Sequence, residues 1–361
     1  MRLAMIITKV DENDSVYGAN IAWIRALAER VEHLTVVGMS VGSYTLPDNT
    51  TVHSLGKENG SSRVARLLWL QLVMLPLILR RRIDGIFVHQ GQVWGAALPY
   101  ARLMGVPVVL FKAHGTMPES IRRFLPFFTK VTTTTKETFV DTPKKVVVGQ
   151  GIDVRRFERK RPLADVVDGG DVSIVSVGRL SPIRRYDAVI DAVAKVQERG
   201  RWQLSLNIYG EPYGPGEQAH ARDLASQVER LGLAGRVHFH GAVPNAELPD
   251  ILSAATVYLS GSLGTSALDK SMLEAMACEL PMITGNPKFA EMFGPYADVL
   301  YCGDAGPEAL ADALERVLAM SAEERARIGT HLRDQVVRCH NVEGLMDQVV
   351  AIMASAKGKP A

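Results

Sequence analysis

The chain has 361 residues, of which 47% are hydrophobic and 22% are charged, a composition typical of a folded enzyme with two domains. Its net charge of +2 is too small to indicate nucleic-acid binding, and the sequence has no zinc-finger spacing or aromatic RNA-binding motif. The three cysteines are odd in number and widely spaced, which argues against a disulfide framework or a metal cluster. We expect Cys278, Cys302 and Cys339 to be reduced and buried, in a cytoplasmic protein.

Apolar β-rich runs alternate with helical periodicity in the first half of the chain, which predicts a parallel sheet. The segment "MRLAMIITKV" is too short for a signal-peptide core and is predicted to form the first strand. A helix is predicted at Ile21–Val31. The predicted strands are Leu3–Thr8, Leu34–Gly38, Thr51–Leu55, Gly85–His89, Val106–Lys112, Val131–Thr135 and Lys145–Gly149.

Two segments of this half indicate peripheral contact with a membrane surface. "RVARLLWLQLVMLPLILRRR" (Arg63–Arg82) is interrupted by Pro76, and its apolar part is shorter than the roughly 20 residues that span a bilayer. "IRRFLPFFTK" (Ile121–Lys130) mixes basic and aromatic residues, a pattern that docks on anionic lipid. Since Leu67–Leu79 is also typical of a core helix, the Phe-rich segment is the better candidate.

The second half repeats the alternation, and continuous apolar runs such as "VSIVSVG" are typical of strands buried on both faces. A charged segment with Pro162 and the Gly169-Gly170 pair predicts a linker near residues 158–170. The predicted strands are Val172–Val177, Gln203–Tyr209, Val237–Phe239, Thr256–Leu259, Pro281–Thr284 and Asp298–Tyr301. The sequence therefore predicts two α/β domains, 1–160 and 168–335, as doubly wound parallel sheets that face each other across a cleft, with ligands at the carboxyl ends of the strands.

A basic loop follows the first strand of the second domain, in "VSVGRLSPIRRYD". Arg179 and Arg184 are thus predicted at the carboxyl edge of the sheet, before a helix that begins near Tyr186. Two guanidinium groups there would neutralise a diphosphate and stabilise it as a leaving group. The alternative is a solvated loop with loose ion pairs, which is the commoner outcome for an isolated arginine pair.

A carboxylate, Glu274, lies near the start of an apolar helix in "GSLGTSALDKSMLEAMACELPMITGN". Ser271 and Glu274 fit a capping box, in which the glutamate only closes the helix. Ser266 with Asp269 offers a competing cap one turn earlier, which would leave Glu274 in the second turn. There its carboxylate would accept hydrogen bonds from the two hydroxyls of a ribose, and the free N–H groups of the helix start would favour a phosphate.

Five segments in order resemble the retaining glycosyltransferases of family 4, the glycosyl transferases group 1, which have the GT-B fold. These segments are "SVGRLSPIRRYD", "NIYGEP", "RVHFHGAV", "LPDILSAATVYLSGS" and "MLEAMACELPMITGN"; "MGVPVVLFKAHG" and "KKVVVGQGIDVRRF" agree more loosely. The resemblance implies that the second domain binds a nucleotide-diphosphate sugar, UDP- or GDP-linked, and that the first binds the acceptor. It also implies that a C-terminal helix, at about 340–356, packs back on the first domain.

The resemblance carries over to single residues. Arg179 falls on the diphosphate-binding arginine, Arg184 on a position that is usually lysine, Glu274 on the ribose-binding glutamate, and His114 on the histidine that faces the transferred sugar. This implies a catalytic set of His114, Arg179, Arg184 and Glu274. The implied donor-binding residues are Gly178, Gly210, Glu211, Val243, Ser266, Asp269, Lys270 and Ser271, and the implied acceptor loop contains Tyr17 and Gly18.

Two departures from the family pattern concern the sugar and the acceptor. Ser266 stands where the family has the first glutamate of its Glu-x7-Glu motif, so another group must hold the sugar hydroxyls. Asp269 is the nearest acid and is our candidate, against the alternative that it only caps the helix. The glycine pair after the first strand is reduced to Gly18.

The resemblance implies a hexosyltransferase of cell-surface glycan and polysaccharide synthesis that retains the anomeric configuration, acts on a saccharide or lipid-linked saccharide, and needs no metal or cofactor. Its departing phosphate oxygen would deprotonate the acceptor. Such an enzyme is expected in the cytoplasm, peripherally on the inner face of the cell membrane. A GT-B sugar-nucleotide epimerase and a non-catalytic nucleotide-sugar-binding partner remain as alternatives.

Overall fold

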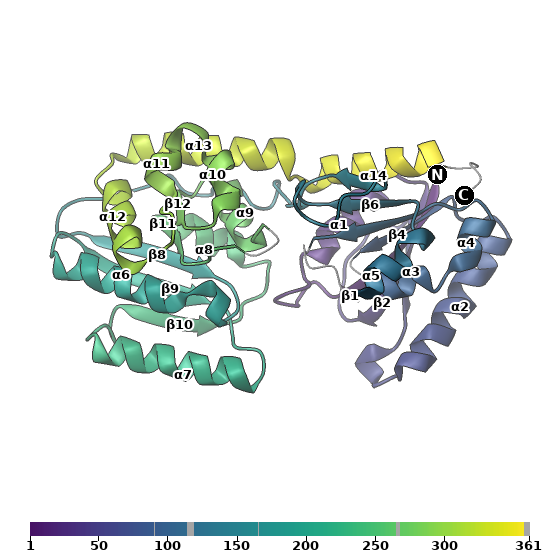
Figure 1. The fold of residues 1–361 in the computed structure, drawn as a ribbon, viewed down its shortest axis with the longest axis horizontal. Coiled ribbons are helices and arrows are strands. Elements are labelled where there is room, and N and C mark those ends of the chain that lie inside the picture. Colours follow the sequence, from purple (N-terminus) through teal and green to yellow (C-terminus); the bar gives the residue numbers. More distant parts are fainter. Residues whose placement is uncertain (90, 114–118, 165, 265–267, 357–361) are drawn as a thin grey trace. The chain divides into compact units, whose positions relative to one another are not determined.

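The computed structural model describes residues 1–89, 91–113, 119–164, 166–264 and 268–356 (Figure 1). The chain divides into two compact units, which are described separately below. Unit 1 contains Met1–Asp153, the short segment Pro244–Ala246 and the C-terminal residues from Cys339 on, and unit 2 contains Val154–Val243 and Glu247–Arg338. Unit 2 thus begins ahead of the segment 158–170 that the sequence analysis took for a linker.

Unit 1 is built on a seven-stranded parallel sheet in the order β3-β2-β1-β4-β5-β6-β7. Its strands are β1 (Arg2–Val10), β2 (His33–Val41), β3 (Thr50–Ser54), β4 (Gly85–His89), β5 (Val108–Lys112), β6 (Lys130–Thr133) and β7 (Lys145–Val147). Its α-helices are α1 (Asn20–Ala28), α2 (Arg63–Leu79), α3 (Gln92–Ala96), α4 (Pro99–Leu103), α5 (Glu119–Phe124) and α14 (Val342–Ala356). Helices cover both faces of the sheet, as expected for a doubly wound domain.

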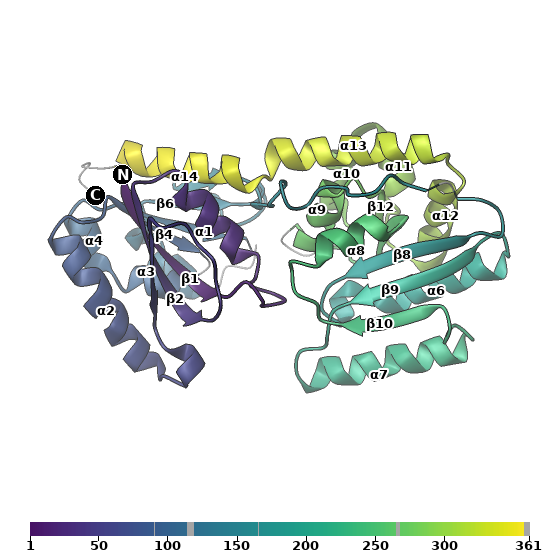
Figure 2. The same ribbon diagram turned by 180° about the vertical axis from the view of Figure 1, so that it is seen from behind.

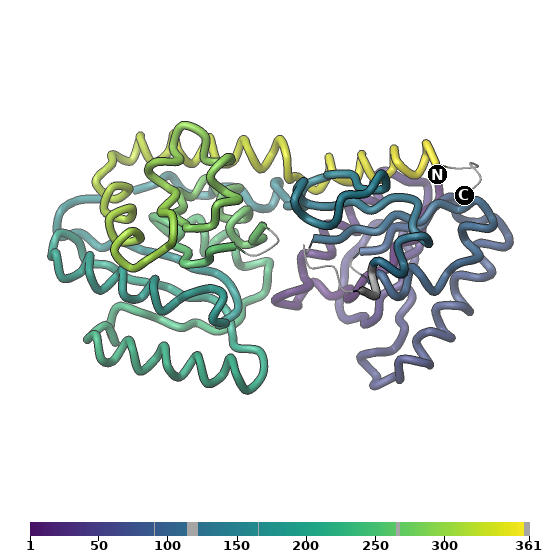
Figure 3. Tube along the Cα trace, in the orientation of Figure 1, coloured from purple at the N-terminus to yellow at the C-terminus, as the bar shows by residue number. Residues whose placement is uncertain are grey.

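The alternation along β1 explains this two-sided core. Leu3 and Met5 pack in one cluster with residues of α1 and α14, whereas Ala4 and Ile6 pack in another with residues of α2. All four side chains are fully buried, because successive residues of a strand point to opposite faces. Figure 3 shows the yellow C-terminal helix beside the purple N-terminal segment, in agreement with the contacts between α1 and α14.

Unit 2 has a five-stranded parallel sheet in the order β10-β9-β8-β11-β12. Its strands are β8 (Asp171–Val177), β9 (Gln203–Tyr209), β10 (Val237–Gly241), β11 (Val257–Ser260) and β12 (Met282–Thr284). Its α-helices are α6 (Tyr186–Glu198), α7 (Pro215–Arg230), α8 (Leu248–Ala254), α9 (Lys270–Ala277), α10 (Ala290–Phe293), α11 (Ala297–Leu300), α12 (Pro307–Leu318) and α13 (Ala322–Cys339). From behind, β8, β9 and β10 lie in front of α6, which places α6 on one face of the sheet (Figure 2).

One predicted strand is wrong. Asp298–Tyr301 was expected to be extended, but the chain forms the short helix α11 over Ala297–Leu300. Only Tyr301 approaches the sheet, through an isolated parallel bridge to Thr284. A four-residue apolar run fits a strand and a helical turn equally well, so the periodicity could not separate the two.

One prediction about burial is also wrong: Cys339 is exposed, although Cys278 and Cys302 are buried as expected. In the Phe-rich segment Phe128 is fully buried, and Phe124 and Phe127 are partly buried against the core of unit 1. The core of unit 1 thus covers part of the aromatic area that the sequence offers to a membrane. Among the described residues no helix is both long and apolar enough to cross a bilayer.

Candidate donor site at the carboxyl edge of unit 2

The order of the strands in unit 2 places a topological switch point between β8 and β11. The chain runs from β8 to its neighbour β9, and later returns to add β11 on the other side of β8. In open α/β sheets ligands bind at such a point, outside the carboxyl ends of the strands. The loop after β8 and the start of α9, which carry most of the predicted donor residues, meet at this edge.

Two glycines let the loops after β8 and β9 touch. Gly210 has a φ of 148°, and a Cβ there would lie 2.0 Å from the Gly178 carbonyl oxygen. Gly178 has a φ of 152°, and a Cβ there would lie 2.9 Å from the Arg184 Nε. Both φ values disfavour other residues, and both positions lack space for a side chain. The predicted Gly178 and Gly210 therefore shape the loop that carries the arginines.

Three hydroxyl groups fasten this loop to its surroundings. Tyr186 donates to the Gly178 carbonyl at 2.9 Å, and both Tyr258 and Ser271 donate to the Val177 carbonyl, at 3.0 and 2.8 Å. Burial raises the pKa of both tyrosines, so they remain neutral donors. Since Ser271 belongs to α9, its bond ties the start of α9 to the end of β8. Ser271 is thus no helix cap, and of the two alternatives the capping box of Ser271 and Glu274 does not form.

Arg184 and Asp269 form an ion pair with 2.8 Å between Nη1 and Oδ1. Burial opposes the charge on Arg184, but the Asp269 carboxylate outweighs it and raises the pKa of Arg184 above its usual value. Asp269 occupies the N-cap position of α9 without a capping hydrogen bond from its side chain. Its Oδ2 is buried and has no hydrogen-bond partner among the described residues. Asp269 therefore positions Arg184, and keeps one oxygen available.

Glu274 lies in the second turn of α9, since the helix begins at Lys270. Its side chain is almost fully buried, and Lys270 one turn earlier lies 3.2 Å from its Oε1. A buried carboxylate needs such a cationic partner or several hydrogen bonds. Lys270, one of the implied donor-binding residues, is thereby directed at Glu274.

The other predicted donor residues line the same edge. Arg179 is more than half exposed and lies 3.2 Å from the Glu217 carboxylate at the start of α7. Glu211 follows β9, and its carbonyl accepts from the Leu180 N–H at 3.2 Å. Val243, half-buried, follows β10. Arg179 and Arg184 thus each have an acidic partner, whereas Arg185 donates to the Asp304 carbonyl.

The predicted acceptor loop of unit 1 is built around Asp14. The Asp14 carboxylate accepts from the Tyr17 N–H at 2.6 Å and from the Lys9 ammonium at 2.6 Å. Burial works against the charge, yet these hydrogen bonds lower the pKa of Asp14 below its usual value. A Cβ on Gly18 would lie 2.5 Å from the Asp14 carbonyl oxygen, so only glycine fits there. Tyr17 is exposed on this loop.

His114 and Ser266, the remaining predicted site residues, lie outside the described residues. Sequence reasoning also missed several residues of the edge: Tyr186, Glu217, Tyr258 and Asn286. Asn286 is fully buried at the end of β12, and its Nδ2 has no partner among the described residues. A tyrosine inside the apolar run "TVYLS" was an available signal, because a buried tyrosine hydroxyl requires a hydrogen-bond partner.

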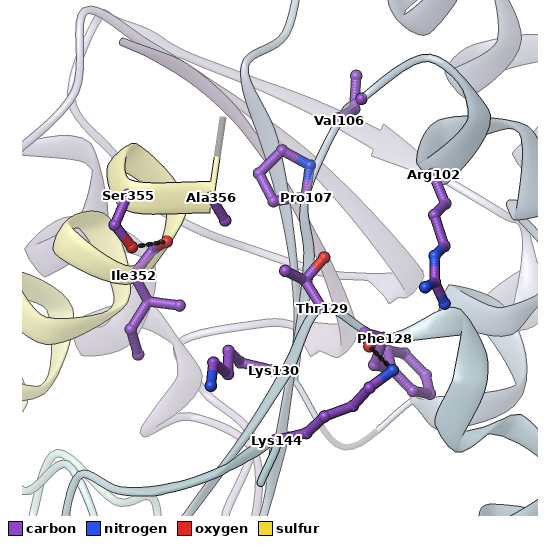
Figure 4. Close-up of a pocket in the computed structure, with 11 residues that line it drawn as sticks. Arg102, Val106, Pro107, Phe128, Thr129, Lys130, Lys144, Ile352, Ser355 and Ala356 are labelled. Atoms are coloured by element: carbon purple, nitrogen blue, oxygen red, sulfur yellow. Dashed lines mark hydrogen bonds between the residues drawn. The ribbon is translucent and has the colours of Figure 1, made fainter. Parts of the chain in front are cut away.

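A cavity of about 340 Å³ lies elsewhere, in unit 1 (Figure 4). Val106-Pro107 and Thr129-Lys130 place it at the amino ends of β5 and β6, and no predicted site residue lines it. Its lysines are engaged by the loops around it: Lys130 donates to the Pro143 carbonyl and Lys144 to the Phe128 carbonyl. We interpret it as a packing feature of the strand starts.

Unit 2 matches a known protein family over most of its length. Residues 171–320 match the family model Glycosyl transferases group 1. Mannosylfructose-phosphate synthase of Agrobacterium fabrum is 32% identical over 111 residues, which are 30% of this chain and 24% of that protein. 2-deoxystreptamine glucosyltransferase of Streptomyces kanamyceticus is 27% identical over 290 residues, which are 69% of this chain and 73% of that protein.

The fold of the whole chain is similar to that of HepE from Anabaena, solved in complex with UDP. The TM-score is 0.75 at 16% identity, over 98% of this chain and 100% of that chain. The chain spans only about a quarter to a third of the length of the curated relatives that it matches at 32% identity. The predicted fold class, GT-B with two Rossmann-like parallel-sheet domains, is confirmed. Residues 171–320, which make up most of unit 2, are thus similar to the family glycosyl transferases group 1.

Proposed function

We propose that this protein is a glycosyltransferase that moves a hexosyl group from a UDP- or GDP-linked sugar to a saccharide or lipid-linked saccharide. The observation that carries the proposal is the meeting of two segments at the carboxyl edge of unit 2. The arginine loop after β8 and the start of α9 are joined there by the Arg184–Asp269 ion pair and by the bond from Ser271 to Val177. Both segments lie within the residues that match the family model.

Each residue of this edge has a role in donor binding. Arg179 and Arg184 bind the diphosphate, and their charge stabilises it as it leaves. The N–H groups at the start of α9 add to that anion site. Glu274 accepts from the ribose hydroxyls, and the unpartnered Asp269 Oδ2 accepts from hydroxyls of the sugar. By the family resemblance we assign His114 and Ser266 to the transferred sugar, and the loop with Tyr17 and Gly18 to the acceptor.

The transfer retains the anomeric configuration and needs no metal. The bond from the anomeric carbon to the diphosphate oxygen breaks, the bond to the acceptor oxygen forms on the same face, and the acceptor's proton passes to the departing phosphate oxygen. The two guanidinium groups supply the positive charge that a metal provides in other transferases.

The relatives and solved structures support the choice of substrate class. They include a D-inositol 3-phosphate glycosyltransferase of Kineococcus radiotolerans and a GDP-mannose-dependent mannosyltransferase of Mus musculus, and one HepE structure contains UDP-glucose. We place the protein in the cytoplasm, peripherally on the inner face of the cell membrane, in the synthesis of polysaccharide or other cell-surface glycan.

Radiolabelled UDP-glucose and GDP-mannose, each with and without a panel of saccharide acceptors, test the proposal. We expect transfer to an acceptor, or slow release of free sugar, with the α-anomeric configuration of the donor kept in the product. The control is the Arg184→Ala variant, which lacks the positive charge that is proposed to bind the diphosphate. Conversion of the donor to its epimer would favour an epimerase, and binding without consumption of any nucleotide sugar would favour a non-catalytic partner.

A further inference from the structure

Helix α2 of unit 1 has two apolar faces, and only one of them is covered. Leu70, Met74 and Ile78 are fully buried in the core between the helix and the sheet. The residues on the other side are large, apolar and exposed. They are Val64, Leu67, Leu68, Trp69, Leu72, Leu75 and Leu79.

The exposed residues form a continuous row along the helix. Leu68, Leu72 and Leu79 expose 60%, 64% and 54% of their surface, and with Leu75 they follow the i, i+4, i+7, i+11 spacing of one helix face. A row of this length exceeds the scattered exposed leucines of an ordinary monomer surface. We define the outer face of α2 as Val64, Leu68, Trp69, Leu72, Leu75 and Leu79.

Within Arg63–Arg82 all charged side chains are arginines. Helix α2 contains no Asp or Glu, Arg63 is exposed at its start, and Arg80-Arg81-Arg82 are exposed at its end. Gln71, its one uncharged polar side chain, is turned inward. It donates to the Ala97 carbonyl at 3.1 Å and accepts from the Tyr100 hydroxyl at 2.7 Å.

We propose that the outer face of α2 docks on the surface of a membrane that contains anionic phospholipid. The leucines and Trp69 enter the boundary between headgroups and acyl chains, with the helix in the plane of the membrane, and the arginines at its two ends bind lipid phosphates. The inference names the surface for the membrane location proposed above and does not depend on the transfer reaction.

A second copy of the chain fits this face less well. In a parallel pair of α2 helices the arginines of equal ends meet, and in an antiparallel pair Arg63 meets the partner's arginine triplet. Neither arrangement supplies an acidic residue from α2, and like charges at such a distance destabilise a pair. An anionic lipid surface offers acyl chains to the apolar row and phosphates to the arginines.

Sedimentation with vesicles tests the inference, with phosphatidylcholine alone compared with a mixture of phosphatidylcholine and phosphatidylglycerol. We expect wild type to bind the mixed vesicles at least about tenfold more strongly, and Leu68→Gln/Leu72→Gln to lose at least about tenfold of that binding. Arg80→Gln/Arg82→Gln should lose the preference for anionic lipid. Leu103→Gln, which alters a leucine exposed by 86% on α4 of the same unit, is the matched control and should bind like wild type.

Tryptophan fluorescence gives an independent readout. Of the four tryptophans, Trp23 and Trp202 are buried, Trp94 is half-buried and Trp69 is 53% exposed on the outer face of α2. A blue shift on mixed vesicles should therefore disappear in Trp69→Phe. Unchanged thermal unfolding in the variants shows that they are folded. The inference is overturned if wild type ignores mixed vesicles, or if Leu68→Gln/Leu72→Gln binds them like wild type. It is equally overturned if lipid-free wild type forms a dimer that this variant abolishes.

Discussion

Asp269 holds Arg184 by a 2.8 Å ion pair at the carboxyl end of β8. The two side chains are each about four-fifths buried and come from segments far apart in the chain. Asp269 thereby has two functions in our proposal: one oxygen fixes the guanidinium that binds the diphosphate, and the other is available for a sugar hydroxyl. The structure does not support the alternative that the Asp269 side chain only caps α9, because that side chain makes no capping hydrogen bond.

Asp269→Asn should lower turnover at least about tenfold, while the affinity for free nucleoside diphosphate stays within about threefold. The amide keeps the shape of the side chain but removes the charge opposite Arg184 and weakens the acceptor for a sugar hydroxyl. Donor kinetics and calorimetric titration with UDP and GDP measure both quantities. Asp250→Asn, the same change at an exposed position of α8, is the control. Unaltered kinetics in Asp269→Asn would show that Asp269 does not bind the sugar.

The two arginines should differ in their effect on stability. Arg184→Ala leaves the Asp269 carboxylate mostly buried without its cation, so we expect a loss of about 1–3 kcal/mol in the free energy of unfolding. Arg179 is more than half exposed, and Arg179→Ala should unfold like wild type. Both should lower turnover about a hundredfold, since both charges are used on the leaving diphosphate.

Arg184→Lys separates charge from geometry at this position. It keeps the cation next to Asp269 and should retain more turnover than Arg184→Ala, because the family usually has lysine there. Thermal unfolding and donor hydrolysis measure the two effects in one set of variants. Equal stability of Arg184→Ala and Arg179→Ala would contradict the structural role of the ion pair.

Much of this site was accessible from sequence, because it depends on local pattern. Apolar runs followed by glycine and arginine placed Gly178 and Arg179 at a strand end, and the strand Gln203–Tyr209 agrees with the structure at both ends. The Arg184–Asp269 pair could not be predicted from the sequence, since no local pattern indicates that Asp269 faces the loop after β8. The sequence named the segment of α2 as a membrane candidate but ranked it below the Phe-rich segment, because its periodicity also fits a core helix; only the packing of unit 1 shows that one side of α2 is open.

Gly210→Ala should lower stability by more than about 1 kcal/mol and reduce donor affinity. The added Cβ would press on the Gly178 carbonyl, whose loop carries both arginines. Gly216→Ala, inside α7 and with nothing within 4 Å of the added Cβ, is the matched control. It should be neutral or stabilising by up to about 1 kcal/mol. Chemical denaturation and UDP titration check both variants, and equal behaviour would refute the contact between the two loops.

His340 makes the stability of unit 1 depend on pH. Burial lowers its pKa to about 4, and its Nδ1 accepts from the Gln150 N–H, which requires a neutral ring. The unfolded chain binds the proton near pH 6.5, so this contribution is complete above pH 6.5 and is lost as pH falls towards 4. The difference in pKa corresponds to roughly 3 kcal/mol. His340→Gln should flatten unfolding free energy against pH in this window, whereas the control His53→Gln on β3 should not.

We propose that Glu274, in the second turn of α9, binds the ribose, and its ion pair with Lys270 allows a direct test. Glu274→Gln and Lys270→Gln both break the 3.2 Å ion pair, but only the first removes the carboxylate.

If Glu274 merely holds Lys270 in place, the two variants should lose affinity for the nucleotide to the same extent. If it accepts from the ribose hydroxyls, Glu274→Gln should weaken binding of the nucleosides uridine or guanosine about tenfold or more, which corresponds to about 1.4 kcal/mol. Lys270→Gln should keep the affinity for a nucleoside, because a nucleoside carries no phosphate group for Lys270 to bind. The 2′,3′-dideoxynucleoside completes the cycle: it should bind wild type and Glu274→Gln with nearly equal affinity, since both hydroxyls from which the carboxylate accepts are absent. Nucleoside binding that survives Glu274→Gln unchanged would assign the ribose to another group and leave Glu274 as the partner of Lys270.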